Sequence, residues 1–250
     1  MATKKATESI QVQQVKLERI KVRIIGTTPL FQNRMSNKVK QSLLVGSKRK
    51  TAAEKAAIKH DPMTEYRDSA ETLPNGPTAL GMRVVAIKSA MCDAAIETAG
   101  LTKAGTQRLI FMPGDHVPLY GTPQLRMDVV RSADMNKTPD VRSRAYLPKW
   151  GCEVEIQYVR PQLSASAIVT LLVNAGVLIG LGDYRQQKGK GAFGSFRVIG
   201  EGEDDAEWNE LTKNHGRIKQ LAALAKPTLA DDETADLMAF YAEERARRSA

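Results

Sequence analysis

Basic and aromatic side chains alternate with glycines over residues 180–194, a combination suited to holding a polyanion. The side chains that carry a charge or a ring are Tyr184, Arg185, Lys188, Lys190 and Phe193, and Arg197 follows. Arg and Lys contact phosphates, Tyr and Phe stack on bases, and glycine lets backbone N–H groups approach an anion. These residue types predict contacts with nucleic acid. The alternative is an exposed hairpin whose charges only keep the protein in solution.

A second basic and aromatic cluster spans residues 142–150. Its members are Arg142, Arg144, Tyr146, Lys149 and Trp150. Rings next to cations indicate a platform on which bases stack while the cations contact phosphates. The alternative is that Tyr146 and Trp150 pack over the edge of a sheet.

A third basic segment, residues 46–61, is rich in Lys and Ala and poor in large apolar residues. Its first cations are Lys48, Arg49 and Lys50. It is interpreted either as a loop that clamps nucleic acid or as a solvated insertion.

Two common nucleotide-binding motifs are excluded. Residues 189–194 spell GxGxxG, but the dinucleotide fingerprint opens a helix, whereas this segment leads into an expected strand. The P-loop pattern fails because Gly191 follows Lys190 where Ser or Thr is needed. No nucleotide cofactor is therefore predicted.

Catalytic motifs are also scarce. The three histidines, His60, His116 and His215, and the two cysteines lack the spacing of a zinc site. Asp183 is a single carboxylate in the glycine-rich segment, and metal-dependent phosphodiester cleavage needs several. No metal site is predicted. RNA cleavage by general acid–base chemistry, with His116 and either Lys190 or Tyr184, is kept as an alternative.

The elements that position these clusters follow from hydrophobic periodicity. Alternation predicts the longer strands, over 17–26, 124–131, 152–158 and 196–199, and shorter strands over 109–112 and 117–120. Helical spacing predicts helices over 38–45, 62–73, 81–99 and 164–175, with Ser164 as the N-cap of the last and Gly176 as its stop. A turn is expected over 29–34. This order predicts an α+β fold with a ferredoxin-like or RRM-like core, both main helices on one sheet face and the other face free.

Charge divides the chain into two parts. The net charge is +9, but residues 201–250 hold 7 Lys and Arg against 12 Asp and Glu, which leaves +14 on residues 1–200. We expect residues 1–200 to form the core, with an insertion at about 30–80. Residues 201–250 are expected to form an acidic extension of two helices, roughly 205–225 and 230–247. A basic body indicates a polyanionic partner, first of all nucleic acid.

The pattern over residues 177–198 also resembles a known family. It reads apolar-Gly-apolar-Gly, a basic spacer, then Gly-x-Gly-x-x-Gly-x-apolar. This resembles the glycine-rich loop of the RAMP superfamily, the CRISPR-associated RNA-binding subunits with RRM-like folds, in which the loop joins the last helix to the last strand. More loosely, the whole chain resembles phage and prophage proteins. The RAMP resemblance implies that RNA is the preferred ligand.

Together these observations predict a protein that binds single-stranded nucleic acid, RNA or single-stranded DNA, as a homo-oligomer or as a subunit of a ribonucleoprotein complex. The alternatives are an RNA-processing endonuclease, a phage single-strand annealing protein and a structural or interaction protein. No run of about 18 apolar residues occurs, so no membrane span is predicted. Two cysteines without a disulfide pattern favour the reducing cytoplasm of a bacterial or phage-infected cell.

Overall fold

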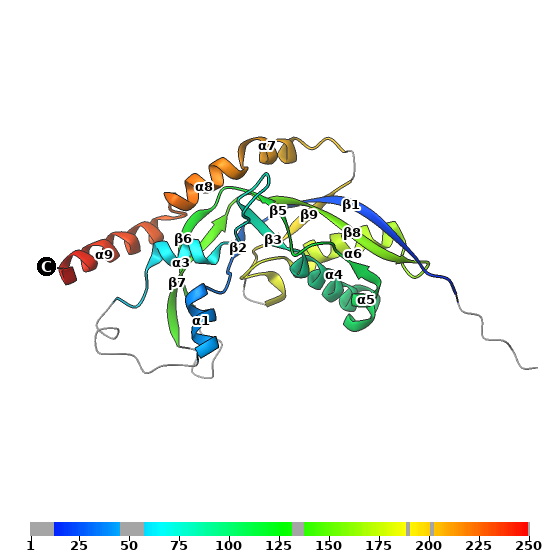
Figure 1. Ribbon diagram of the computed structural model, residues 1–250, viewed down its shortest axis with the longest axis horizontal. Coiled ribbons are helices and arrows are strands. Elements are labelled where there is room, and N and C mark those ends of the chain that lie inside the picture. The colour runs from blue at the N-terminus through cyan, green and yellow to red at the C-terminus, as the bar shows by residue number, and fades with distance from the viewer. Residues whose placement is uncertain (1–12, 46–57, 132–137, 189–190, 201–202, 250) are drawn as a thin grey trace, which may run out of the picture.

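The computed structural model describes residues 13–45, 58–131, 138–188, 191–200 and 203–249. They form an α+β fold with two antiparallel sheets and helices packed around them (Figure 1). The fold class therefore agrees with the sequence-based expectation.

The larger sheet is built around its N-terminal strand. Its strands are β1 (Lys16–Gly26), β3 (Leu80–Arg83), β4 (Ile110–Phe111), β5 (His116–Tyr120), β8 (Gly151–Arg160) and β9 (Phe196–Ile199). They lie in the order β3-β5-β8-β1-β9, with β4 also beside β8, and neighbouring strands are antiparallel. β8 and β9 therefore run parallel to each other on either side of β1. The prediction that 152–158 and 196–199 share one sheet is confirmed.

Two helices cover one face of this sheet. α6 (Ala165–Asn174) carries the chain from β8 towards β9 and packs beside α4 (Val84–Ala99), on the lower side of the sheet in Figure 1. Val22 and Ile24, alternate residues of β1, belong to the same buried cluster as Ile87 of α4. The period-2 pattern of β1 thus directs its apolar side chains towards the helices.

The end of α6 differs from the expectation. Ser164 caps the helix through its hydroxyl oxygen, as predicted, but the predicted stop at Gly176 is wrong. The chain continues as a π-helical turn over Ala175–Ile179 and ends at Gly180, whose φ is 72°. At Gly176 an added Cβ would lie 2.1 Å from the carbonyl oxygen of Phe196. This glycine therefore permits close packing of the turn on β9.

The opposite face of the larger sheet is charged and partly covered. Arg23 Nε lies 3.1 Å from the carboxylate of Glu153 on the neighbouring strand. Ile25 packs with Trp208 of α7 (Ala206–Asn214) in a second buried cluster. The prediction that this face of the sheet is free is therefore wrong around Ile25, because α7 packs against the sheet there.

The smaller sheet has the order β2-β7-β6. Its strands are β2 (Leu30–Gln32), β6 (Gln124–Arg131) and β7 (Pro139–Leu147). The prediction of β6 is confirmed, but the turn expected over 29–34 is wrong, because β2 is a buried strand there. Three residues are too few to display an alternating pattern. Two helices follow β2 along the chain, α1 (Asn37–Val45) and α3 (Pro62–Ser69), and α3 packs on β7 and β6.

The described part of the C-terminal extension, residues 203–249, has three helices where two were predicted. The first predicted helix breaks at His215, giving α7 and α8 (Arg217–Ala225), and α9 (Asp232–Ser249) follows and leads away from the body (Figure 1). Gln220 of α8 is fully buried, and its Nε2 donates to the carbonyl oxygens of Leu119 and Gly121 at 2.8 and 2.9 Å. The extension therefore packs on the core of its own chain.

The remaining short elements are α5 (Lys103–Leu109) and a 3-10 turn over Gln186–Lys188. None of the helices in the described ranges is long and apolar enough to cross a membrane. Cys92 and Cys152 are free and buried, and burial raises the pKa of Cys152 to about 12.

Candidate nucleic-acid interface

The glycines of the loop 180–194 allow chain segments to pack against each other. An added Cβ would lie 2.4 Å from Phe31 O at Gly182, 1.7 Å from Tyr184 O at Gly191 and 1.8 Å from Leu181 O at Gly194. Gly182 and Gly194 also have φ values of 76°, which favour glycine. The loop therefore needs glycine for steric and conformational reasons that involve no ligand.

Several N–H groups of this loop are already engaged inside the protein. Leu181 donates to Gly194 O at 2.9 Å, Asp183 to Phe31 O at 3.0 Å, and Gly194 to Pro29 O at 2.8 Å. The expectation that the loop backbone offers its N–H groups to an anion is wrong for these three groups. The first bond joins the two ends of the loop, and the other two dock the loop onto β2 and the residue before it.

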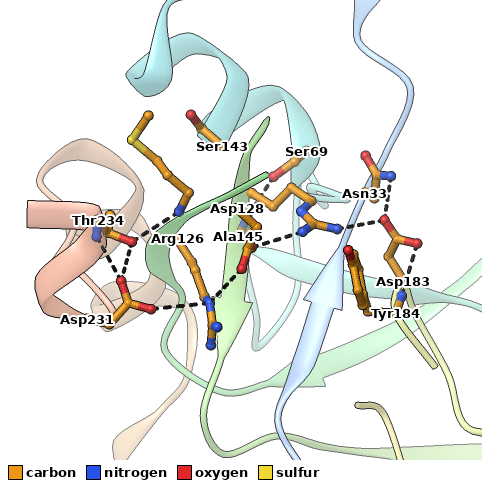
Figure 2. Close-up of polar contacts among 12 residues, drawn as sticks. Asn33, Ser69, Arg126, Asp128, Ser143, Ala145, Asp183, Tyr184, Asp231 and Thr234 are labelled. Carbon is orange, nitrogen blue, oxygen red and sulfur yellow. Dashed lines mark hydrogen bonds and ion pairs between the residues drawn. The ribbon is translucent and has the colours of Figure 1, made fainter. Parts of the chain in front are cut away.

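A ladder of alternating charges fixes the loop to the smaller sheet (Figure 2). Arg144 Nη1 donates to Asp183 and Nη2 donates to Asp128, both at 2.9 Å. Asp128 also accepts from Arg126 Nε at 3.1 Å, and Arg126 lies 3.4 Å from Asp231 at the start of α9. Arg144 is 1% exposed. The prediction that Arg144 contacts phosphate is therefore wrong, because its charge is buried between two carboxylates.

The other residues of the cluster over 142–150 lie in different surroundings from Arg144 and from one another. Trp150 is 0% exposed and its Nε1 donates to the Thr28 carbonyl at 2.8 Å, so its ring offers no face to a base. The prediction of stacking by Trp150 is wrong, and the alternative of packing holds for it. Lys149 is exposed with its Nζ 3.8 Å from Glu210, and Arg142 is exposed on β7.

Arg197 is compensated by the C-terminal extension. Its Nη2 lies 2.8 Å from Asp205 and 3.1 Å from Glu207. The hydrogen bond to Asp205, with a smaller one to Glu207, raises the pKa of Arg197 although partial burial opposes the shift. The positive charge of Arg197 is therefore compensated by two carboxylates at the start of α7. Some of the predicted contacts with nucleic acid lie outside the described residues. They are those of Lys48, Arg49, Lys50 and Lys190 and of the Lys188 side chain.

Arg185 holds the 3-10 turn of the loop. Its Nε and Nη2 donate to Gln187 Oε1 at 3.1 and 2.9 Å. Gln187 in turn donates to Asp93 of α4 at 2.8 Å, and Asp93 also accepts from Lys103 at 2.6 Å. Burial alone would raise the pKa of Asp93, but these two hydrogen bonds lower it below its ordinary value.

The rings of the loop join an aromatic cluster on the smaller sheet. Phe31 lies 4.9 Å from Phe193, 5.2 Å from Tyr146 and 6.3 Å from Tyr184, measured between ring centroids. The guanidinium carbon of Arg126 lies 5.2 Å from the Tyr146 centroid. Tyr146, Tyr184 and Phe193 are half-buried, so each keeps an exposed part.

A groove of about 850 Å³ lies where the two sheets meet, and we call it the junction groove. Its cations are Arg34, Lys40, Arg83 and Arg185, and its carboxylates are Glu71 and Asp183. The formal charges of these six side chains sum to +2. His116 also lines the groove and is not included in this sum. The sequence analysis missed Arg34, Lys40 and Arg83, since they lie far apart along the chain and no local pattern connects them.

Glu71 organises one wall of the junction groove. Its carboxylate lies 3.7 Å from Arg34 Nε, 3.9 Å from Arg83 Nε and 3.5 Å from His116 Nε2. Arg83 remains 60% exposed in its side chain, and Lys40 is also exposed. The wall therefore presents cations to solvent while one carboxylate sets their spacing.

No protein-family model matches this sequence, and no curated protein matches it significantly. In the part of the chain that the structure describes, no group of three or more His, Cys, Asp or Glu side chains is placed to hold a metal ion. Inferences about the function of this protein therefore rest on the chemistry and arrangement of its own residues.

Proposed function

We propose that the protein binds single-stranded nucleic acid along the junction groove. The observation that carries this proposal is the concentration of Arg34, Lys40 and Arg83 around one hollow, with the exposed parts of Tyr184 and Phe193 on the adjoining loop. Cations that track a backbone next to rings that stack on bases are the usual composition of a single-strand binding surface.

RNA is the preferred ligand in this proposal. The strand order β9-β1-β8, with β4 or β5 next and α4 and α6 on one face, supports an RRM-like core. The resemblance of residues 177–198 to the RAMP loop points the same way. Single-stranded DNA is the alternative ligand. The same proposal includes the assembly of several copies of the protein along one strand, in the cytoplasm.

The dependence of affinity on salt tests the groove. Each phosphate contact to a single strand contributes a slope of about −0.7 in a plot of log K against log salt concentration. Replacing Lys40 and Arg83 together by Ala should therefore weaken binding and flatten the slope by about 1.4. Fluorescence anisotropy with a labelled 30-mer RNA, and with DNA of the same sequence, measures both quantities.

A matched control removes the same charge elsewhere. Arg108 on α5 and Lys219 on α8 are exposed and line no part of the groove. The double variant Arg108→Ala, Lys219→Ala should keep the parent slope. Equal slopes for the parent and the Lys40, Arg83 variant would overturn the placement of the strand in this groove.

One observation favours a second candidate, metal-independent RNA cleavage. His116 faces the same groove 3.5 Å from the Glu71 carboxylate, an arrangement that orients an imidazole for proton transfer. Tyr184, the partner expected from the sequence, does not line this groove, and Lys190 lies outside the described residues.

A further inference from the structure

A second hollow of about 610 Å³ lies on the other side of the loop, between the loop, β6 and the start of α9. We call it the ring pocket. The side chains that matter in it are Tyr184, Phe193, Arg126, Asp128 and Glu233, while Phe31, which also lines the pocket, is 1% exposed and offers no face to a ligand. It therefore combines aromatic rings, one guanidinium and two carboxylates.

The backbone of Tyr184 is held in a strained conformation at this pocket. Its φ is 56°, the value of a left-handed residue that is not glycine. Two contacts maintain it: the Tyr184 N–H donates to Asp183 Oδ1 at 3.0 Å, and the Phe193 N–H donates to the Tyr184 carbonyl at 3.3 Å. Strain of this kind persists where the surroundings over-determine it, and it concentrates at ligand-binding sites.

The polar groups of the ring pocket are only partly used. Arg126 engages Asp128 and Asp231 through Nε, and within the described residues its two Nη atoms donate no hydrogen bond. Glu233 is exposed in the first turn of α9 and makes no hydrogen bond or ion pair with another described residue. A flat ligand that stacks on the rings would meet a donor and an acceptor at its edge.

We propose that the ring pocket binds guanine bases of the strand that the junction groove holds. This inference rests on the proposed function and names the base that the strand presents. The Watson–Crick edge of guanine offers the O6 acceptor beside two donors, N1–H and N2–H. O6 accepts from the Nη atoms of Arg126, and the two donors match the carboxylate of Glu233. Uracil, cytosine and adenine do not present one acceptor followed by two adjacent donors.

The test compares guanosine with inosine, which lacks only the 2-amino group. Two 12-mer RNAs of uridine carry either guanosine or inosine at three positions, and binding is followed by anisotropy. The parent should bind the guanosine strand about fivefold more tightly, the low end for recognition of one base edge by paired hydrogen bonds. Glu233→Gln should bind both strands alike, because an amide offers one acceptor and one repelling donor to the base.

Glu243→Gln is the matched control, since Glu243 is also exposed on α9 but lines no part of the pocket. It should keep the parent preference. Equal affinity of the parent for both strands, with binding intact, would overturn the guanine assignment and leave the proposed function standing. Absence of binding to either strand would overturn both. Free guanosine monophosphate that competes as well as the strand would overturn the assignment to a base within a strand.

Discussion

The glycine-rich loop and the wall of the junction groove use their charges in opposite ways. The loop is conspicuous in sequence, yet its described charged side chains, Asp183 and Arg185, are engaged with the protein itself. The groove wall is inconspicuous in sequence, yet Lys40 and Arg83 remain exposed. A cluster of charges along the chain therefore does not identify the charges that are available to a ligand. The partners that folding brings to each cation decide this.

The largest expected effect on stability distinguishes two arginines of β7, the buried Arg144 and the exposed Arg142. Arg144→Ala should lower the free energy of unfolding by about 3–5 kcal/mol, because two carboxylates lose the buried cation between them. Arg142→Ala should change it by no more than about 0.5 kcal/mol, since Arg142 is exposed. Urea unfolding followed by circular dichroism measures both. A small loss in Arg144→Ala would mean that the loop does not depend on this ladder.

The next effect concerns the glycines of the loop. Gly194→Ala should cost more than about 2 kcal/mol, because φ is 76° and the new Cβ would meet Leu181 O at 1.8 Å. Gly100 has a similar φ of 62° but open space around it, so Gly100→Ala isolates the conformational cost of about 1 kcal/mol. Thermal unfolding of the two variants should therefore differ. Equal losses would show that close packing in the loop contributes nothing.

A smaller effect should appear at low pH. The folded pKa of Asp93 lies below the ordinary 3.8, so its stabilising contacts with Lys103 and Gln187 are present above pH 3.8 and are lost as pH falls further. Because Lys103 is partly exposed, the contribution is below about 1 kcal/mol. Asp93→Asn should be less stable than the parent at pH 6 and approach it at pH 3 in urea titrations. A difference that grows on acidification would contradict this assignment.

The smallest expected effect is at His116. His116→Ala should leave RNA affinity within about twofold of the parent, because the groove retains Arg34, Lys40 and Arg83. Incubation of parent and variant with labelled RNA should yield no products. Products made by the parent and absent from the variant would instead establish the cleavage hypothesis and give the groove wall a catalytic role.

Much of the fold could be predicted because its main elements show clear periodicity. β1, β6 and α6 have apolar residues at the spacing of their structure, and their positions agree with the sequence analysis. β2 could not be predicted, since it is three residues long and buried on all sides by other parts of the chain. Its partner β7 lies more than 100 residues further along the sequence.

The candidate site was only partly predictable for a related reason. Tyr184 and Phe193 lie on the loop that the sequence singled out, and both keep exposed parts. Trp150 and Arg144 were chosen for residue type, which does not reveal burial or partners. Arg34 and Arg83 both lie beside Glu71, and such a contact between distant segments leaves no local signal.

The position of β1 in its sheet has a consequence for how the protein is made. Its partner β8 begins at Gly151, and β9 begins at Phe196, so both neighbours follow long after β1 itself. At about 5–20 residues per second, the ribosome needs roughly 6–25 s to pass from the end of β1 to the start of β8. During this interval Ile20, Val22 and Ile24 have no strand to pair with. Lys21 and Arg23, which alternate with them, are the charges that discourage association of nascent chains.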